Sequence, residues 1–141
     1  MGDSDGLQRF VDAQEAGGTY AAALEELRDG RKTGHWMWFV FPQIAGLGRS
    51  ATAQRFALSG RDEAVAYAAH PVLGPRLRAC AEVLTQLPGT DAAAVFGPLD
   101  AQKLQSSMTL FARAAPDVPV FRQVLDRHFD GAEDEGTVSR L

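Results

Sequence analysis

An aromatic segment of nine residues constrains the fold of this chain more than any other feature. It runs from His35 to Gln43 with the sequence His-Trp-Met-Trp-Phe-Val-Phe-Pro-Gln, and it holds both tryptophans of the chain. As a strand it would be apolar on both faces, because successive side chains alternate in direction. The segment must therefore run through the interior, either as a buried strand or as a helical turn, and periodicity does not separate the two.

The polar ends of this segment suggest a site. His35 and Gln43 are groups that an interior segment can present at the rim of a cavity, with Trp36 and Trp38 in its wall. The alternative is a segment that serves only as core, with the indole N–H groups bonded to backbone carbonyls. The sequence leaves both interpretations open.

Elsewhere the apolar pattern predicts helices. The clearest one carries Leu73, Leu77, Cys80, Leu84 and Leu87 at steps of four, three, four and three. Caps, glycines and prolines delimit further helical segments over 5–15, 19–29, 50–57, 62–70, 90–96, 100–115 and 118–129. Strand signals are limited to the aromatic segment and a short piece near Val138. We therefore expect a mainly α fold of about six to eight helices, with a minor short sheet at most.

Size and composition predict one domain over residues 1–141. The chain is 45% hydrophobic and 23% charged, which is typical of a globular protein with a sizeable core. Residues 1–4 and the acidic stretch 131–136 are expected to be flexible. The formal net charge of −4 argues against general binding to nucleic acid or to anionic lipid.

The lack of a cysteine pair, a signal peptide pattern and a long apolar run predicts the cellular compartment. The single cysteine, Cys80, cannot form an intrachain disulfide, and the first residues do not resemble a signal peptide. No apolar run approaches the roughly 18 residues of a membrane span. A cytoplasmic protein without a membrane span is therefore expected, and the sequence indicates no particular oligomeric state.

Metal and cofactor motifs are absent from the sequence. The three histidines lie far apart, and no His-x-x-x-His or Cys-x-x-Cys pair occurs. We expect no metal and no cofactor. The loop Gly46-Leu47-Gly48-Arg49-Ser50 is more suggestive, because glycines before a helix leave backbone N–H groups free to bind an anion, and Arg49 adds a forked donor. The alternative is a tight turn followed by an ordinary serine cap at Ser50.

Lysine is rare in this chain, and its two positions are both of interest. Lys32 comes just before the aromatic segment, and Lys103 lies early in a late helix. Lysine can lose its proton where it is desolvated, as a Schiff-base nucleophile or general base must. Asp100, Lys103 and Ser107 share a helical face, which predicts a surface ion pair or one wall of a polar pocket. A solvated side chain is the alternative for each lysine.

Short motifs over most of the chain carry a family resemblance. They are Arg9-Phe10, Ala13-Gln14, Tyr20, Ala23-Leu24, Lys32, His35 to Gln43, Gly46-Leu47-Gly48, Ser50, His70-Pro71, Leu73-Gly74, Arg76-Leu77, Asp100, Lys103-Leu104, and Ser106-Ser107 to Phe111. In this order they resemble the bacterial family called domain of unknown function eighteen-ten, sometimes labelled calpastatin-like. The resemblance implies a mainly helical fold and brings no assigned activity.

That family is similar, more remotely, to the YbiA-like or NADAR superfamily, which implies a single compact YbiA-like domain. Members of the superfamily process ribosyl N-glycosides and ADP-ribose conjugates, and a lysine and a nearby carboxylate take part in the cleavage. The spacing from Glu25 to Lys32 is similar to their glutamate-then-lysine signature. Asp100 with Lys103 is the alternative location that the resemblance implies.

We therefore expect an N-glycosidase-like enzyme, or a binder, acting on a small phosphorylated ribosyl or nucleotide ligand of the ADP-ribose type. Lys32 would attack the anomeric carbon or the open-chain aldehyde, and Glu25 or Asp100 would move protons. The two tryptophans would stack on a base or exclude water from the site, and Arg49 with its loop would hold phosphate. The alternative is a non-catalytic regulatory or protein-interaction module, in which the aromatic segment is only core.

Overall fold

Helices make up most of the fold, as predicted. The structure, a computed structural model, describes the backbone of residues 2–141 and the side chains of residues 6–141. The longer helices are α1 (Gly2–Glu15), α2 (Thr19–Arg28), α5 (Arg61–Ala69), α6 (Leu73–Gln86), α8 (Pro98–Ala114) and α9 (Val120–Phe129). The short ones are α3 (Met37–Val40), α4 (Ala51–Arg55), α7 (Ala92–Phe96), α10 (Glu135–Val138) and the 3-10 helix η1 (Ala16–Gly18). None of the helices in the described part of the chain has the length and apolar character needed to cross a membrane.

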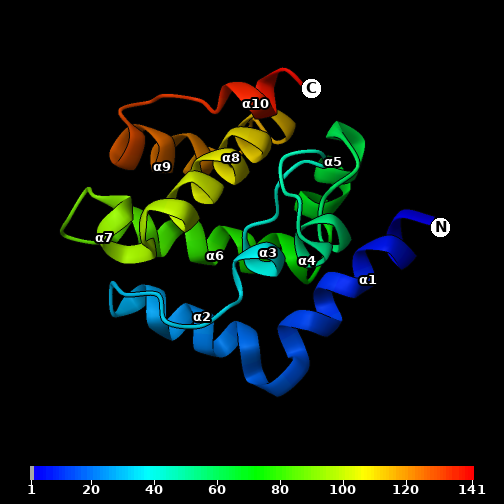
Figure 1. Ribbon diagram of the computed structural model, residues 1–141, viewed down its shortest axis with the longest axis horizontal. Coiled ribbons are helices and arrows are strands. Elements are labelled where there is room, and N and C mark those ends of the chain that lie inside the picture. Colours follow the sequence, from blue (N-terminus) through cyan, green and yellow to red (C-terminus); the bar gives the residue numbers. More distant parts are fainter. Residues whose placement is uncertain (1) are drawn as a thin grey trace.

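The helices pack around α6 and α8 (Figure 1). α9 contacts both of them, α5 also contacts both, and α2 lies against α6 on the other side. α7 and α10 pack on α8, and α1 contacts α2, α3 and α5. The expected minor sheet is reduced, over residues 2–141, to one isolated parallel bridge between Ile44 and Leu58.

The α6 stripe is buried as its spacing predicts. Leu73, Leu77, Cys80 and Leu84 are at most 1% exposed, and Leu87 follows directly after the helix. The carbonyls at the end of α6 need partners, because the last turn of a helix leaves them unbonded. The last turn of α9 supplies them: His128 Nε2 lies 2.8 Å from the Leu84 carbonyl oxygen, and Arg127 donates to the Leu87 carbonyl. The most regular helix of the sequence is thus fixed at its end by α9.

The aromatic segment forms a helical turn, α3, and not a strand. Phe39 N and Val40 N both lie 3.2 Å from the Trp36 carbonyl oxygen, and Phe41 N donates to the Met37 carbonyl. Trp36 is only 2% exposed, and its ring packs near the Phe41 ring in the core. A turn of 3.6 residues spreads side chains around an axis, whereas a strand alternates them. Trp36 therefore enters the core while Trp38 stays half-buried.

The C-terminal segment packs against α8. The strand expected near Val138 is wrong, because Val138 ends the helix α10. The stretch 131–136, expected to be flexible, makes specific contacts: Glu133 accepts hydrogen bonds from Arg113 and Arg122 at 2.7 to 3.1 Å. The flexibility expected of 131–136 stays a prediction. The expectation for residues 1–4 concerns side chains outside the described ones and stays a prediction.

Asp134 anchors this segment as the N-cap of α10. Its Oδ2 accepts from Thr137 N at 2.9 Å and from Thr137 Oγ1 at 2.7 Å. Asp134→Ala should lower the free energy of unfolding by about 1 kcal/mol, the usual cost of removing a cap. Asp134→Asn should retain most of this stability, because asparagine caps helices equally well. Urea denaturation of the three proteins measures the difference, and equal losses in both variants would contradict the capping role.

Candidate functional site

Both lysines of the chain contact the same carboxylate. Lys32 Nζ lies 2.8 Å from Asp100 Oδ2, and Lys103 Nζ lies 3.0 Å from Asp100 Oδ1. Lys32 follows α2, whereas Asp100 and Lys103 lie in the first turns of α8. We call these three residues the lysine–aspartate cluster. The lysines of the two alternative locations thus meet at one carboxylate, without Glu25.

Lys32 is the more restrained of the two lysines. Its side chain is 8% exposed, against 29% for Lys103. Its backbone N–H donates to the Val95 carbonyl at 2.8 Å, and its Nζ donates to the Gly34 carbonyl at 2.5 Å. Both Nζ partners are hydrogen-bond acceptors, so Lys32 donates in both contacts.

Glu26 shapes the loop that carries Lys32. Its Oε1 accepts hydrogen bonds from Thr33 N at 2.7 Å, Gly34 N at 2.8 Å and Trp36 Nε1 at 3.0 Å. Burial alone would raise the pKa of Glu26, but these donors outweigh it and hold the pKa below its ordinary value. A Cβ on Gly34 would lie 2.8 Å from Trp36 Cδ1, so the loop requires glycine there. Glu26 therefore fixes Trp36 and the loop before it.

The structure brings Glu26 to this region and leaves Glu25 exposed on α2. Helical geometry could have indicated from the sequence that Glu26, and not Glu25, lies on the buried side of the helix. Ala23 and Leu27 are buried one turn apart, and Glu25 lies midway between them in sequence, which places it on the opposite face of the helix. Glu26 lies three residues after Ala23 and hence closer to the buried face. The spacing from Glu25 to Lys32, which is similar to the superfamily signature, thus points one residue away from Glu26, the carboxylate that holds the loop of Lys32.

The lysine–aspartate cluster lines a cavity of about 400 Å³. We call it the cluster cavity; its walls are Lys32, His35, Met37, Trp38, Phe96, Gly97, Pro98, Leu99, Asp100 and Lys103. Lys103 Nζ lies 5.2 Å from the centre of the Trp38 ring, within the range of a cation–π contact. Burial alone would raise the pKa of Asp100, but hydrogen bonds from Lys32 and then Lys103 prevail and hold it below its ordinary value. Asp100 is therefore a carboxylate at neutral pH.

A second cavity of about 480 Å³ adjoins the first along α8. We call it the amide cavity; its walls are Gln43, Leu47, Gly48, Leu99, Gln102, Lys103, Gln105, Ser106, Asp134 and Gly136. Leu99 and Lys103 line both cavities. The two ends of the aromatic segment are thus divided, with His35 at the cluster cavity and Gln43 at the amide cavity.

The glycine loop is only partly connected to these cavities. Gly48 lines the amide cavity, where a Cβ would lie 2.4 Å from Ala53 Cβ. Ser50 Oγ accepts from Ala53 N at 3.1 Å and caps the five-residue helix α4. Arg49 is exposed, and Gly46 has a positive φ of 100° beside Arg140. The loop geometry is that of a tight turn with a serine cap.

Ser107 also lies apart from the cavities. It shares a helical face with Asp100 and Lys103 but is fully buried in α8. Within residues 6–141 its Oγ has no hydrogen-bond partner. Helical spacing correctly predicts that Ser107 shares a face of α8 with Asp100 and Lys103. That part of α8 is buried, however, so Ser107 does not line a cavity with them.

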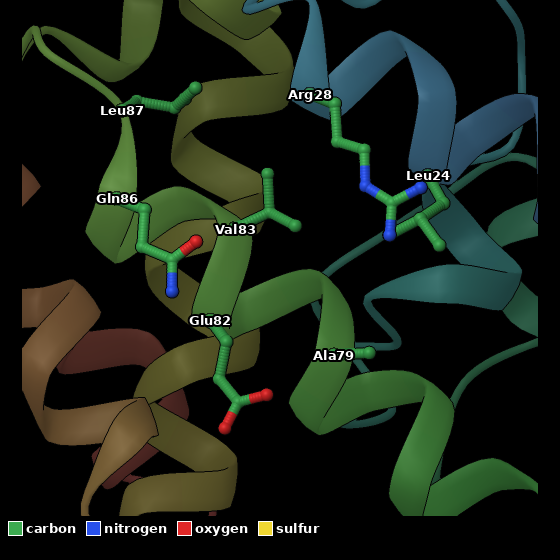
Figure 2. A pocket seen from close by; sticks show the side chains of 7 residues that line it. All are labelled: Leu24, Arg28, Ala79, Glu82, Val83, Gln86 and Leu87. Atoms are coloured by element: carbon green, nitrogen blue, oxygen red, sulfur yellow. The ribbon is translucent and has the colours of Figure 1, made fainter.

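Another cavity of about 400 Å³ lies between α2 and α6 (Figure 2). Its walls are Leu24, Arg28, Ala79, Glu82, Val83, Gln86 and Leu87. In Figure 2 the charged ends of Arg28, from α2, and Glu82, from α6, are separated and do not face each other. The cavity presents no group of facing charges among the described side chains, so the lysine–aspartate cluster is the better candidate for chemistry.

The charge of Glu26 should make the loop sensitive to pH. Its pKa is lowered in the folded chain, so its stabilising effect is present above the ordinary glutamate value of about 4.3 and is lost as pH falls below it. Glu26→Gln keeps an acceptor oxygen but loses the charge, and roughly half of the hydrogen-bond strength should go with it. The difference in Tm between wild type and Glu26→Gln should therefore shrink from pH 6 to pH 3. A difference that stays constant would show that charge at Glu26 is unimportant.

Comparisons with known proteins agree with this fold. The family model described as "Protein of unknown function (DUF1810)" matches residues 4–141. The crystal structure of the conserved hypothetical protein Rv1873 from Mycobacterium tuberculosis is 50% identical, with a TM-score of 0.92, over 96% of this chain and 95% of that one. No curated protein matches the chain. By its sequence and its fold, the chain belongs to the DUF1810 family.

Proposed function

We propose that the chain binds a small phosphorylated ribosyl ligand in the cluster cavity and cleaves its N-glycosidic bond. The observation that carries the proposal is the convergence of both lysines on Asp100 at the wall of a cavity that also holds an indole ring. Charged groups with a shifted pKa in a concave site are typical of functional sites.

The charge of the cluster favours an anionic ligand. Two ammonium groups and one carboxylate leave a local charge of +1, in a chain whose formal net charge is −4. Gly97, Pro98 and Leu99, at the start of the 17-residue helix α8, line the same cavity, and the helix dipole adds positive potential there. Lys103 is the more exposed lysine, so it is the better placed to turn toward a phosphate.

Asp100 is suited to stabilise positive charge. Because its pKa is lowered, it is ionised at neutral pH and is a poor proton donor. As the bond between the ribosyl C1′ and the base nitrogen breaks, positive charge develops on the sugar, and a nearby carboxylate stabilises it. The base leaves with the electron pair of the bond. Water adds its oxygen to C1′, and its proton goes to the departing base.

A covalent route through Lys32 is the second form of this proposal. Lys32 Nζ, held 2.8 Å from Asp100 Oδ2, would give up a proton to solvent and attack C1′ as the base leaves with the electron pair of its bond and takes the second Nζ proton. The ribosyl ring would then open to an imine on Nζ, with the last Nζ proton moving to the ring oxygen, and water would hydrolyse the imine to the free sugar and the amine. Arginine at this position would stay protonated and could not form the adduct. Glu25 is remote from this role because it does not line the cluster cavity.

Binding tests the proposal first. Titration calorimetry with ADP-ribose and with ribose 5-phosphate should give binding by wild type that Lys103→Gln weakens at least tenfold, because the phosphate loses its cation. The matched control is Arg113, another cation on α8, which pairs with Glu133 and lines neither the cluster cavity nor the neighbouring one. Arg113→Gln should bind as wild type does. Failure of both ligands to bind wild type would favour the non-catalytic module instead.

Borohydride trapping then separates the two routes. Wild type, Lys32→Arg and Lys103→Arg are incubated with ADP-ribose and borohydride, and adducts are located by intact mass and peptide mapping. An adduct that only Lys32→Arg abolishes supports the covalent route. An adduct lost only in Lys103→Arg assigns the nucleophile to α8. Turnover is followed separately as release of nicotinamide from NAD, and turnover without an adduct in wild type supports the route in which Asp100 stabilises the charged sugar.

A further inference from the structure

We infer that the amide cavity is a second subsite, which holds the uncharged, nucleoside-like part of a two-part ligand whose anionic part lies at the lysine–aspartate cluster. The inference rests on the proposed function and narrows its substrate class from any ribosyl phosphate to a dinucleotide-type ligand. Three observations support the inference. The two cavities share lining residues, the amide cavity is lined by polar side chains, and contacts outside the amide cavity fix its walls.

The two cavities form one path along α8. Leu99 and Lys103 line both, so they stand at the junction. Leu99 is 73% exposed, although it is a large apolar side chain beside two concave surfaces. A ligand that spans both cavities would cover Leu99 and place its linking phosphates next to Lys103.

The chemistry of the wall changes along this path. The cluster cavity carries two ammonium groups and one carboxylate, whereas the amide cavity has Lys103 balanced by Asp134. Its other polar side chains are three glutamines, Gln43, Gln102 and Gln105, and one serine, Ser106. An amide both donates and accepts hydrogen bonds. Such a wall recognises neutral groups that present donors and acceptors together, as sugar hydroxyls and the edges of nucleobases do.

Part of this hydrogen-bonding capacity is left for a ligand. Gln105 Nε2 donates to the Ala132 carbonyl at 3.0 Å, which leaves its acceptor oxygen. Asp134 uses Oδ2 for Thr137, which leaves Oδ1. Among the described residues, the side-chain amides of Gln43 and Gln102 have no hydrogen-bond partner.

The walls of the amide cavity are held in place by contacts outside it. Asp134 N donates to Thr109 Oγ1 at 2.9 Å, which joins the C-terminal segment to the buried face of α8. A Cβ on Gly136 would lie 3.1 Å from Leu47 Cδ2, so α10 and the glycine loop are in close contact. Arg140 also donates to the Gly46 carbonyl at 3.4 Å. The cavity is therefore formed by three chain segments that are tied together.

Affinity measurements test the subsite. Gln43→Leu and Gln102→Leu should each weaken ADP-ribose binding about three- to tenfold, the effect of losing one or two hydrogen bonds. Both variants should bind ribose 5-phosphate within about twofold of wild type, because that probe ends at the cluster. Gln123→Leu is the matched control, since Gln123 is an exposed glutamine on α9 that lines neither cavity. Unchanged ADP-ribose affinity in both cavity variants would overturn the inference.

A third probe separates this inference from the proposed function. Adenosine carries no phosphate, so it should shift the side-chain NH₂ signals of Gln43, Gln102 and Gln105 in NMR spectra and leave those of Gln123 in place. If ribose 5-phosphate does not bind while adenosine gives these shifts, the proposed reaction fails and the second subsite stands. If ribose 5-phosphate binds but adenosine leaves all the glutamine signals unchanged, the proposed function stands and the second subsite is refuted.

Discussion

Asp100→Ala should lower the free energy of unfolding by about 2 to 4 kcal/mol, because it leaves Lys32 buried without its counter-ion. Removing one partner of a fully buried ion pair costs about 3 to 5 kcal/mol, and the 21% exposure of Asp100 reduces that figure. The Lys32 ammonium would retain only the Gly34 carbonyl as an acceptor and the Trp36 ring at 5.1 Å. The same change should abolish the proposed cleavage, because it removes the carboxylate that stabilises the charged sugar. Urea denaturation measures the first effect, and release of nicotinamide from NAD measures the second.

Two further variants make this result interpretable. Glu133→Ala removes the other carboxylate that pairs with two cations, but Arg113 and Arg122 are 43% and 45% exposed, so the cost should stay below about 1 kcal/mol. Lys32→Met combined with Asp100→Ala should recover much of the lost stability, since no buried charge then remains unpaired. Equal losses in Asp100→Ala and Glu133→Ala would show that burial of Lys32 does not matter.

Elements whose structure depends on the local spacing of apolar residues could be predicted from the sequence. The α6 stripe is an example, because a helix with one apolar line has one way to face the core. The burial of Trp36, Met37, Val40 and Phe41 in the aromatic segment was also predictable, since either alternative required a buried segment. Its choice of a helical turn over a strand was not, because the turn is decided by neighbours: the Glu26 carboxylate receives the Trp36 indole N–H, and Phe96 packs edge-on against the ring at 6.4 Å.

The lysine–aspartate cluster shows where prediction from one sequence stops. Spacing within α8 indicated the pair Asp100 and Lys103, and rarity of lysine drew attention to Lys32. Nothing local indicated that they meet. Their meeting depends on a backbone hydrogen bond from Lys32 to Val95, which docks the loop after α2 onto α7 just before α8 begins. Contacts between segments this far apart in sequence are set by the tertiary fold.

Substitution of the two tryptophans should have different effects, on stability for Trp36 and on ligand binding for Trp38. Trp36→Ala should cost about 3 to 5 kcal/mol of unfolding free energy, the usual range for truncating a large buried aromatic side chain. Its ring is 2% exposed, packs against Phe41 and Phe96, and donates to Glu26. Its loss would leave a cavity in the core and take one donor from the Glu26 carboxylate. Urea denaturation of the variant measures this cost.

Trp38→Ala should weaken ligand binding more than it destabilises the fold. The Trp38 ring is half-buried and forms part of the cluster cavity, where Lys103 lies over it. A cation–π contact contributes about 0.5 to 2 kcal/mol, and the ring also covers the ribosyl group at the cluster, so affinity for ribose 5-phosphate and for ADP-ribose should fall about three- to thirtyfold, while stability falls less than in Trp36→Ala. If Trp38→Ala destabilised the fold as much as Trp36→Ala and left affinity unchanged, both rings would be core, and the cluster cavity would lose the aromatic wall on which the proposed ligand depends.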